Sequence, residues 1–383
     1  MHETLQALWT FPAIILAALL IAWAAECGQF YISQGLALAV LAWLQTLPEF
    51  AVEAVIALEA AKDPAKVHLM TANFTGSLRL FVGLGWPLVY FVAVFFGKKL
   101  PTKRDSWTIH LEEEQSVAVM TLVPALLYFL FIYFKGTLTM VDSAVLAAIY
   151  FTYLFLLSKM PPEEKEELSD LGAVPHWIMG LKGAATVWMI VLFFAIGGAV
   201  LFFVAHPFLE SMMAVAMTMG VSQFVFVQWL APFLSEFPEQ LSAFRWAKSV
   251  KKAPMALANF VSSSINQWTI LVATVPCIYS FGMGHPTAIL FDEHQKVEIL
   301  LTIVQSYLGF LFLFSMDFSG AEATGLFLLW IAQFFVPGIR EEIIYVYGFW
   351  ALIETVKLFM GRKQPNALRS FVKIFREHFL QKA

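Results

Sequence analysis

Charged residues are scarce in this chain. Asp, Glu, Lys and Arg make up 14% of the 383 residues, whereas they make up about a quarter of a typical soluble domain. Hydrophobic residues make up 60%, and the mean hydropathy is +0.73. These values exclude an ordinary soluble domain and predict an all-α, multi-pass membrane protein. The net charge of −4 provides no nucleic-acid-binding patch, so we expect a lipid bilayer as a partner and no nucleic acid.

Cysteine is also rare. The two cysteines, Cys27 and Cys277, lie far apart in apolar surroundings, so no disulfide framework is expected. No Cys/His cluster or Gly-rich phosphate loop stands out, and we expect no bound cofactor. The stretch Met1 to Leu8 contains no Lys or Arg, so residues 8–25 are interpreted as a first span rather than as a cleaved signal peptide.

Long apolar runs dominate what remains, and a run of about 20 residues suffices to cross a bilayer. The predicted spans are 8–25, 33–60, 67–97, 117–134, 138–158, 184–205, 212–244, 254–283, 295–315 and 320–337. Five spans in each half would make the two halves inverted relative to one another, as in many secondary transporters. The predicted organisation is a first repeat at 1–158, a cytoplasmic loop at 159–183, a second repeat at 184–337, and a C-terminal helix with a basic tail at 338–383.

Lys and Arg set the expected orientation. With the N-terminus outside, the inner loops at 98–104, 159–182 and 245–252 carry eleven Lys or Arg, and the outer loops carry four. The basic tail from Arg362 onward would then be cytoplasmic only if an eleventh helix crosses the membrane at 341–361. The alternative is that 341–361 is an amphipathic helix on the membrane surface.

One short motif occurs twice. Residues 43–49 are Trp-Leu-Gln-Thr-Leu-Pro-Glu, and residues 233–239 are Phe-Leu-Ser-Glu-Phe-Pro-Glu. A second pair follows: Ala-Asn-Phe-Thr-Gly-Ser at 72–77 and Ala-Asn-Phe-Val-Ser-Ser at 258–263. A proline beside a carboxylate is costly at membrane depth unless it lines a binding cavity. The repeated motifs therefore predict two related half-sites.

Glu49 and Glu239 are the principal candidates. The proline before each glutamate removes a backbone donor and frees a carbonyl upstream, and carbonyls, hydroxyls and carboxylates together suit a hard cation such as Ca²⁺ or Na⁺. The alternative is a protonated Glu at a helix contact. Thr46 and Glu236 occupy matching positions, and Ser235 precedes Glu236. The Glu236–Glu239 pair favours a divalent ion or a bound proton, unless Glu236 faces the loop near Arg245.

The second motif supplies Ser77 and Ser263 as candidate ligands, with helix packing as the alternative role. For Asn73 and Asn259 we expect that the amides brace the broken helices. Arg79 is a basic residue inside a predicted span, and we expect a fixed ion pair with Glu53 or Glu59. Glu53 itself has three candidate roles: an ion ligand, a vestibule charge and a salt-bridge partner.

These two motifs resemble the alpha repeats of the cation/Ca²⁺ exchanger superfamily, which includes the sodium/calcium exchangers and their prokaryotic relatives. The family patterns Gly-Thr-Ser-Leu-Pro-Glu and Gly-Asn-x-x-Gly-Ser match in degenerate form at 44–49, 234–239, 72–77 and 258–263, within alpha motifs at 43–81 and 231–267. The resemblance implies a Ca²⁺ site of two glutamates flanked by Na⁺ sites, and alternating access by sliding of the first and sixth spans. It also implies a multi-pass protein of a prokaryotic cell membrane.

The chain departs from the family at three positions. Family members carry Asn or Asp four residues after each motif serine, where this chain has Phe81 and Gln267, and Glu236 replaces a hydroxyl. We expect a secondary cation antiporter that exchanges Ca²⁺ for Na⁺ or H⁺, not an enzyme, with the ion between Glu49 and Glu239. The alternatives are an intramembrane carboxylate enzyme and a non-transporting homologue that acts as a sensor or scaffold.

Overall fold

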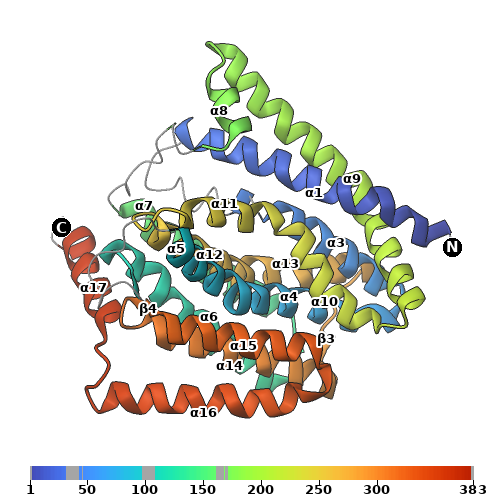
Figure 1. The fold of residues 1–383 in the computed structure, drawn as a ribbon. Helices are drawn as coiled ribbons and strands as arrows, with labels where there is room; N and C mark the ends of the chain where they lie inside the picture. Colours follow the sequence, from blue (N-terminus) through green and yellow to red (C-terminus); the bar gives the residue numbers. More distant parts are fainter. Residues whose placement is uncertain are drawn as a thin grey trace.

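The protein is a bundle of helices with two very short sheets at its ends (Figure 1). The structure, a computed structural model, describes residues 2–31, 43–44, 46–96, 108–160, 168 and 171–380. The predicted second span at 33–60 and the loop at 159–183 lie partly outside these residues. Six of the described helices are long and apolar enough to cross a membrane, which agrees with a multi-pass membrane protein.

The helices follow one another along the chain with short connections. In the first half they are α1 (His2–Gly28), α3 (Leu47–Lys62), α4 (Val67–Leu80), α5 (Trp86–Phe96), α6 (Ser116–Lys135) and α7 (Met140–Lys159). A short helix α8 (Ala173–Met179) lies inside the predicted loop. The later helices are α9 (Ala184–Met219), α10 (Gln223–Ser235), α11 (Phe237–Ala247), α12 (Ala253–Asn266), α13 (Val272–Met283), α14 (Glu293–Leu313), α15 (Gly320–Phe335), α16 (Arg340–Phe359) and α17 (Asn366–Phe375).

Two antiparallel strand pairs lie at opposite ends of the bundle (Figure 1). Strand β1 (Thr108–His110) pairs with β4 (Asp317–Ser319), and β2 (Thr137–Leu138) pairs with β3 (Ile289–Leu290). Each pair joins a segment of the first half to one of the second half, so the two halves are clamped together at both ends.

The sequence-based boundary between the sixth and seventh spans is wrong. We expected separate spans at 184–205 and 212–244, but α9 continues without a break to Met219. Pro207 lies inside this helix without ending it, and the helix stops at Gly220, whose φ of 68° is left-handed. Glycine adopts that conformation without the penalty that a Cβ imposes, so it ends the helix there.

Helices α1 and α9 form a pair that lies obliquely across the other helices (Figure 1). Thr10 of α1 and Ser211 of α9 share a buried hydrogen bond of 2.8 Å between their hydroxyls. At one end, Glu26 of α1 accepts hydrogen bonds from Ser242 and Arg245 of α11. Farther along α9, His206 lies 3.3 Å from a carboxyl oxygen of Glu59 on α3.

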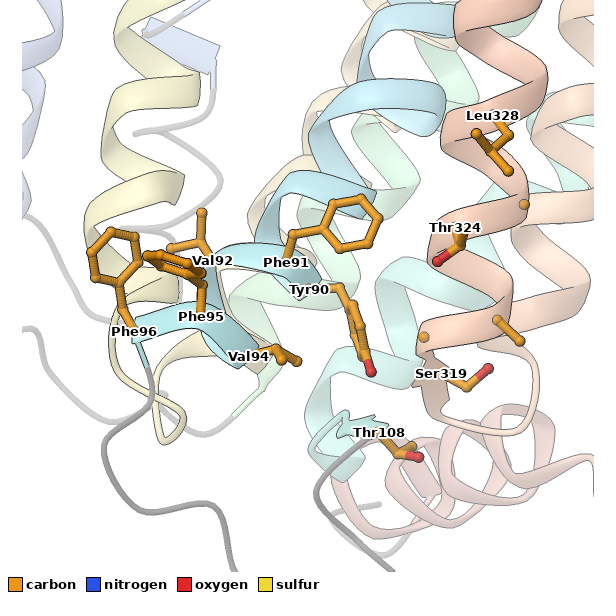
Figure 2. A pocket seen from close by; sticks show the side chains of 13 residues that line it. Tyr90, Phe91, Val92, Val94, Phe95, Phe96, Thr108, Ser319, Thr324 and Leu328 are labelled. Carbon is orange, nitrogen blue, oxygen red and sulfur yellow. The ribbon is translucent and has the colours of Figure 1, made fainter.

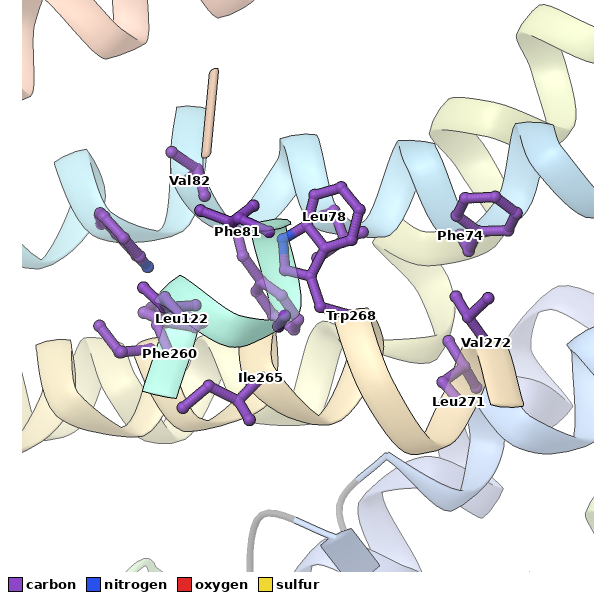
Figure 3. Packing of buried hydrophobic residues seen from close by; sticks show 14 of the residues in the cluster. Phe74, Leu78, Phe81, Val82, Leu122, Phe260, Ile265, Trp268, Leu271 and Val272 are labelled. Carbon is purple, nitrogen blue, oxygen red and sulfur yellow. The ribbon is translucent and has the colours of Figure 1, made fainter. Parts of the chain in front are cut away.

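The two motif helices α4 and α12 are held by aromatic packing (Figure 3). The rings of Phe81 and Phe260 lie 5.4 Å apart between centroids, and those of Phe129 and Trp268 lie 4.4 Å apart in an edge contact. All four rings are buried. Offset and edge contacts of this kind add to the stabilisation from area burial alone, so they fix the spacing of the motif helices.

Gly76 sets the distance between α4 and α10. A Cβ at this position would lie 1.8 Å from the backbone carbonyl oxygen of Gln228. Only glycine permits this approach, and Gly76 directly precedes Ser77 of the second motif.

A buried charge cluster joins α4 to the C-terminal helices. Arg79 pairs with Glu298 of α14 at 2.6 Å and donates to Gln333 of α15 at 3.1 Å. Arg340, the first residue of α16, also pairs with Glu298, and Gln228 of α10 donates to it at 2.8 Å. The cluster therefore links five helices at one point.

The predicted partners of Arg79 were wrong, although the predicted ion pair exists. Glu53 accepts a hydrogen bond from Asn73 instead, and Glu59 pairs with Lys62 and Lys66. The true partner, Glu298, is 219 residues away in the chain. A carboxylate inside a predicted span was its only sequence signal.

We expect Gly76→Ala to destabilise the protein by about 1–3 kcal/mol, the usual cost of overpacking. The new methyl group would collide with backbone that cannot give way, and the thermal unfolding midpoint in detergent would fall. Gly198→Ala on α9 is the matched control, because a Cβ there meets nothing within 4 Å. Equal midpoints for the two variants would contradict the close approach of α4 and α10.

We expect Glu298→Gln to cost about 3–5 kcal/mol, because it leaves two buried guanidinium groups without their carboxylate. Glu293→Gln is the control on the same helix: its pair with Lys296 is solvent-exposed and worth at most about 1 kcal/mol. Thermal unfolding followed by size-exclusion chromatography measures both. A Glu298→Gln protein as stable as the control would show that the cluster does not hold the fold together.

Candidate ion-binding site

Two helix breaks carry the candidate glutamates. Helix α10 ends at Ser235 and α11 begins at Phe237, so Glu236 lies in the break with Pro238 in the first turn of α11. In the first half, Thr46 precedes α3, which has Pro48 in its first turn. Glu49 and Glu239 therefore each lie in the first turn of a helix, where the helix dipole favours negative charge.

Gln267 joins the two breaks. Its Nε2 donates to Oε2 of Glu49 and to Oε1 of Glu236, at 2.9 Å in each case. The amide thus bridges a carboxyl of the first half and one of the second half. Ser77 lies beside both carboxyls, so this part of the predicted site does assemble.

Glu239 is held by the second motif of its own half. Ser263 donates a short hydrogen bond to Oε1 of Glu239, and Asn259 donates to the same oxygen at 3.3 Å. In the first half, Asn73 donates to Oε2 of Glu53 at 2.6 Å. The expectation that the two Asn amides brace broken backbone is therefore wrong: both orient carboxyl groups.

Four carboxyl groups gather at this place, all buried: Glu49, Glu53, Glu236 and Glu239. Glu49 lies close enough to each of the other three for their charges to interact. Each carboxyl has one oxygen hydrogen-bonded within the protein and, among the described residues, one buried oxygen with no hydrogen-bond partner. Buried oxygens of this kind normally have a partner, so the arrangement leaves four oxygens free to bind cations or protons.

Two neutral oxygens share this property. The hydroxyl of Ser77 and the Oε1 of Gln267 are buried and form no hydrogen bond within the described part of the chain. Gln267 therefore presents its amide NH₂ to two carboxyls and keeps its carbonyl oxygen for another ligand. Carboxylate, amide and hydroxyl oxygens are the donor set of hard cations.

Two predicted hydroxyl ligands are used differently. Ser235 donates to the Ala231 carbonyl at 2.9 Å, one turn back in its own helix. Thr46 donates to the Trp43 carbonyl at 2.9 Å and accepts from Asn266 at 2.5 Å. Sequence reasoning missed Asn266, because its neighbour Gln267 occupies the position that the motif singles out.

The alternative orientation of Glu236 is not the one found. The side chain was allowed to face the loop near Arg245, but it lies buried against Gln267. Arg245 instead bonds Glu26 and Ser242, so it does not neutralise the carboxyl cluster.

Both motif helices widen into a single π-helical turn four residues after the motif serine. The π turn η3 (Phe81–Gly85) follows α4, and η6 (Gln267–Leu271) follows α12. Such turns occur frequently at functional sites. Their first residues, Phe81 and Gln267, are the two positions at which the chain departs from the family motif.

The charges of the four carboxyls interact, but their oxygens do not form a closed cage. No group of three or more His, Cys, Asp or Glu in the described residues is arranged to hold a metal ion by itself. Gln267 and the motif serines separate the carboxyls, so a bound cation would need these neutral oxygens as well.

A pocket of about 1140 Å³ opens elsewhere, between α5 and α15 (Figure 2). Aromatic side chains such as Tyr90, Phe91 and Phe95 line it, with Ser319 and Thr324 as polar groups. It contains no carboxylate and none of the candidate ligands, so it is separate from the ion site.

Comparisons with known proteins agree with this architecture. The family model described as sodium/calcium exchanger protein matches residues 4–159 and 189–337. The crystal structure of an H⁺/Ca²⁺ exchanger, CAX, is 31% identical and superimposes with a TM-score of 0.88, covering 98% of this chain and 91% of that chain.

Structures of the sodium-calcium exchanger NCX_Mj share the fold at lower identity. One, soaked with Na⁺ and Sr²⁺, is 16% identical with a TM-score of 0.53, covering 87% of this chain and 96% of that chain. No curated protein matches the chain in sequence. The family match over both halves, together with the 31% identical exchanger, shows that this chain belongs to the sodium/calcium exchanger protein family.

Proposed function

We propose that this chain is an antiporter that exchanges Ca²⁺ for H⁺, with Glu49 and Glu239 as the central ligands. The observation that carries the proposal is the cluster of four buried carboxyls, each with one oxygen free of protein hydrogen bonds. Four like charges in a low-dielectric site must be balanced by metal cations or by protons. Because the same oxygens would take either one, Ca²⁺ and H⁺ would compete, and competition for one site is the basis of exchange.

The ligand set supports a proton rather than Na⁺ as the counter-ion. A Na⁺ site needs several neutral oxygens, but Phe81 supplies none and packs its ring against Phe260. Glu236 adds a carboxyl where the family has a hydroxyl, and a carboxyl can carry a proton. The similarity to an H⁺/Ca²⁺ exchanger over nearly the whole chain supports the same assignment.

The remaining predicted ligands are assigned by their place around this cluster. Glu236, Gln267, Ser77 and Ser263 contact the central carboxyls and would complete the coordination shell. Ser235 and Thr46 would contribute through lone pairs that their own hydrogen bonds leave available.

We further propose alternating access by movement of the α1–α9 pair across the other helices. The pair is joined internally by Thr10 and Ser211 and is tied to the remaining helices through Glu26–Arg245 and His206–Glu59. These polar ties are few, so a sliding motion would break little. The matching helix breaks and π turns support two inverted repeats at 1–158 and 184–337, with α16 as an eleventh helix and residues 159–183 and the tail in the cytoplasm of a prokaryotic cell.

The family assignment removes the enzyme alternative, because exchanger family members are transporters rather than enzymes. A non-transporting homologue remains the competing hypothesis, and ion flux decides between the two.

We expect Glu49→Gln and Glu239→Gln each to lower Ca²⁺ flux into proteoliposomes roughly thirtyfold or more, since losing one buried charged ligand costs about 2 kcal/mol or more. Both variants should elute from size-exclusion chromatography as the parent does. Glu293→Gln, which changes an exposed carboxylate, is the control and should transport normally. Parent-like flux in either site variant would refute a shared two-glutamate site.

Coupling is tested by driving Ca²⁺ uptake with an imposed pH gradient and, separately, with an imposed Na⁺ gradient. We expect the pH gradient to drive uptake and Glu236→Ser to reduce the slope of log uptake against pH by up to about one, because one proton-binding group is removed. Glu293→Gln again serves as the control. Uptake driven by Na⁺ alone and indifferent to pH would contradict proton coupling.

A further inference from the structure

Helix α17 has three distinct faces. Residues three and four apart share a face of a helix. Ala367, Phe371 and Ile374 form the face packed against α6 and η4 (Glu113–Gln115); Ala367 and Ile374 are buried and Phe371 is partly buried. The second face is apolar but exposed, and it consists of Leu368, Val372 and Phe375, which are 42%, 39% and 37% exposed. The third face carries Arg369, Lys373 and, just after the helix, Arg376.

Two of the three basic side chains are not neutralised by the protein. Lys373 pairs with Glu113 at 2.6 Å, with Glu114 and Glu377 nearby. Within the described residues, the side chains of Arg369 and Arg376 form no ion pair or hydrogen bond, and both are exposed. An exposed apolar stripe therefore lies beside two free guanidinium groups.

The position of α17 matches the level of lipid headgroups. Figure 1 shows it at the end of the bundle near β4, running across the direction of α15 and α16. Its first turn is anchored to the end of α14: the Ala367 amide donates to the Phe314 carbonyl at 3.0 Å, and Asn366 donates to the Ser315 carbonyl at 3.0 Å. A helix held across the end of a membrane-spanning bundle lies in the interface between water and hydrocarbon.

We propose that α17 binds the bilayer surface through anionic phospholipids. Leu368, Val372 and Phe375 enter the boundary of the acyl chains, and Arg369 and Arg376 bind the phosphate groups. An amphipathic helix with basic and apolar stripes binds such a surface in this way, and guanidinium groups suit phosphate because of their fork of donors. This surface is independent of which ion the protein transports.

The test measures where the exposed apolar stripe lies in a membrane. The full chain, with Cys27 and Cys277 replaced by alanine, carries a spin label at Val372→Cys or, as the control on the opposite face, at Ser370→Cys. Each protein is reconstituted in phosphatidylcholine and in phosphatidylcholine with phosphatidylglycerol. Collision with oxygen reports lipid exposure, and collision with a water-soluble nickel chelate reports water exposure.

We expect anionic lipid to lower nickel collisions and raise oxygen collisions at Val372, with little change at Ser370. Two charges should shift the bound-to-free population by about thirtyfold, and high salt should reverse part of the shift. The pair Arg369→Gln and Arg376→Gln should remove the dependence on phosphatidylglycerol, whereas Arg369→Lys and Arg376→Lys should keep most of it.

Two results would overturn the proposal. Equal, high nickel collisions at Val372 in both lipid mixtures would show that the stripe stays in water. Full protection already present in pure phosphatidylcholine and unchanged by the Gln pair would show that something other than anionic lipid covers it, such as a protein partner or a second copy. The folding of each variant is checked by size-exclusion chromatography, so misfolding is distinguished from loss of lipid binding.

Discussion

The burial of four carboxyl groups in one place is the constraint on which the rest of the structure depends. Water cannot solvate them there, so charge balance must come from helix ends, amide donors and the ions that the site takes up. Two helix starts point at Glu49 and Glu239, and Gln267 donates to two carboxyls at once. These partial compensations stabilise the arrangement without filling it, because every carboxyl keeps one oxygen for a ligand.

The surrounding helices hold this cluster with short-range contacts. Gly76 brings α4 against α10, and the Phe81–Phe260 and Phe129–Trp268 rings pack the motif helices from the other side. The Arg79–Glu298–Arg340 cluster is buried as well, but its guanidinium groups are paired within the protein. The molecule thus contains two buried polar centres of opposite character: one in which carboxylate meets Arg, and one in which carboxylate meets only neutral donors.

Sequence reasoning could locate the carboxyl cluster because its residues lie in a repeated local pattern. The breaks at Thr46 and Glu236 follow from proline, and the placement of Gln267 follows from its distance to Ser263. Contacts between distant segments left no such signal. Arg79 pairs with a residue 219 positions away, and no local rule distinguishes Glu298 from Glu53 or Glu59. The continuity of α9 through Pro207 was also hidden, because tertiary packing overrides the helix-breaking tendency of proline in a long apolar helix.

The two π turns have a consequence for how the family can vary. A π turn contains one more residue than the α-helical turn it replaces, so the helix beyond it is rotated by about one residue, or 100°. Deletion of a single residue within 81–85 or 267–271 would restore a regular helix and turn a different face of α5 or α13 toward its neighbours. Point substitutions at Phe81 or Gln267 keep that rotation. Ligand chemistry can therefore drift at these two positions while chain length cannot, and ion selectivity in this lineage would evolve by substitution rather than by insertion or deletion.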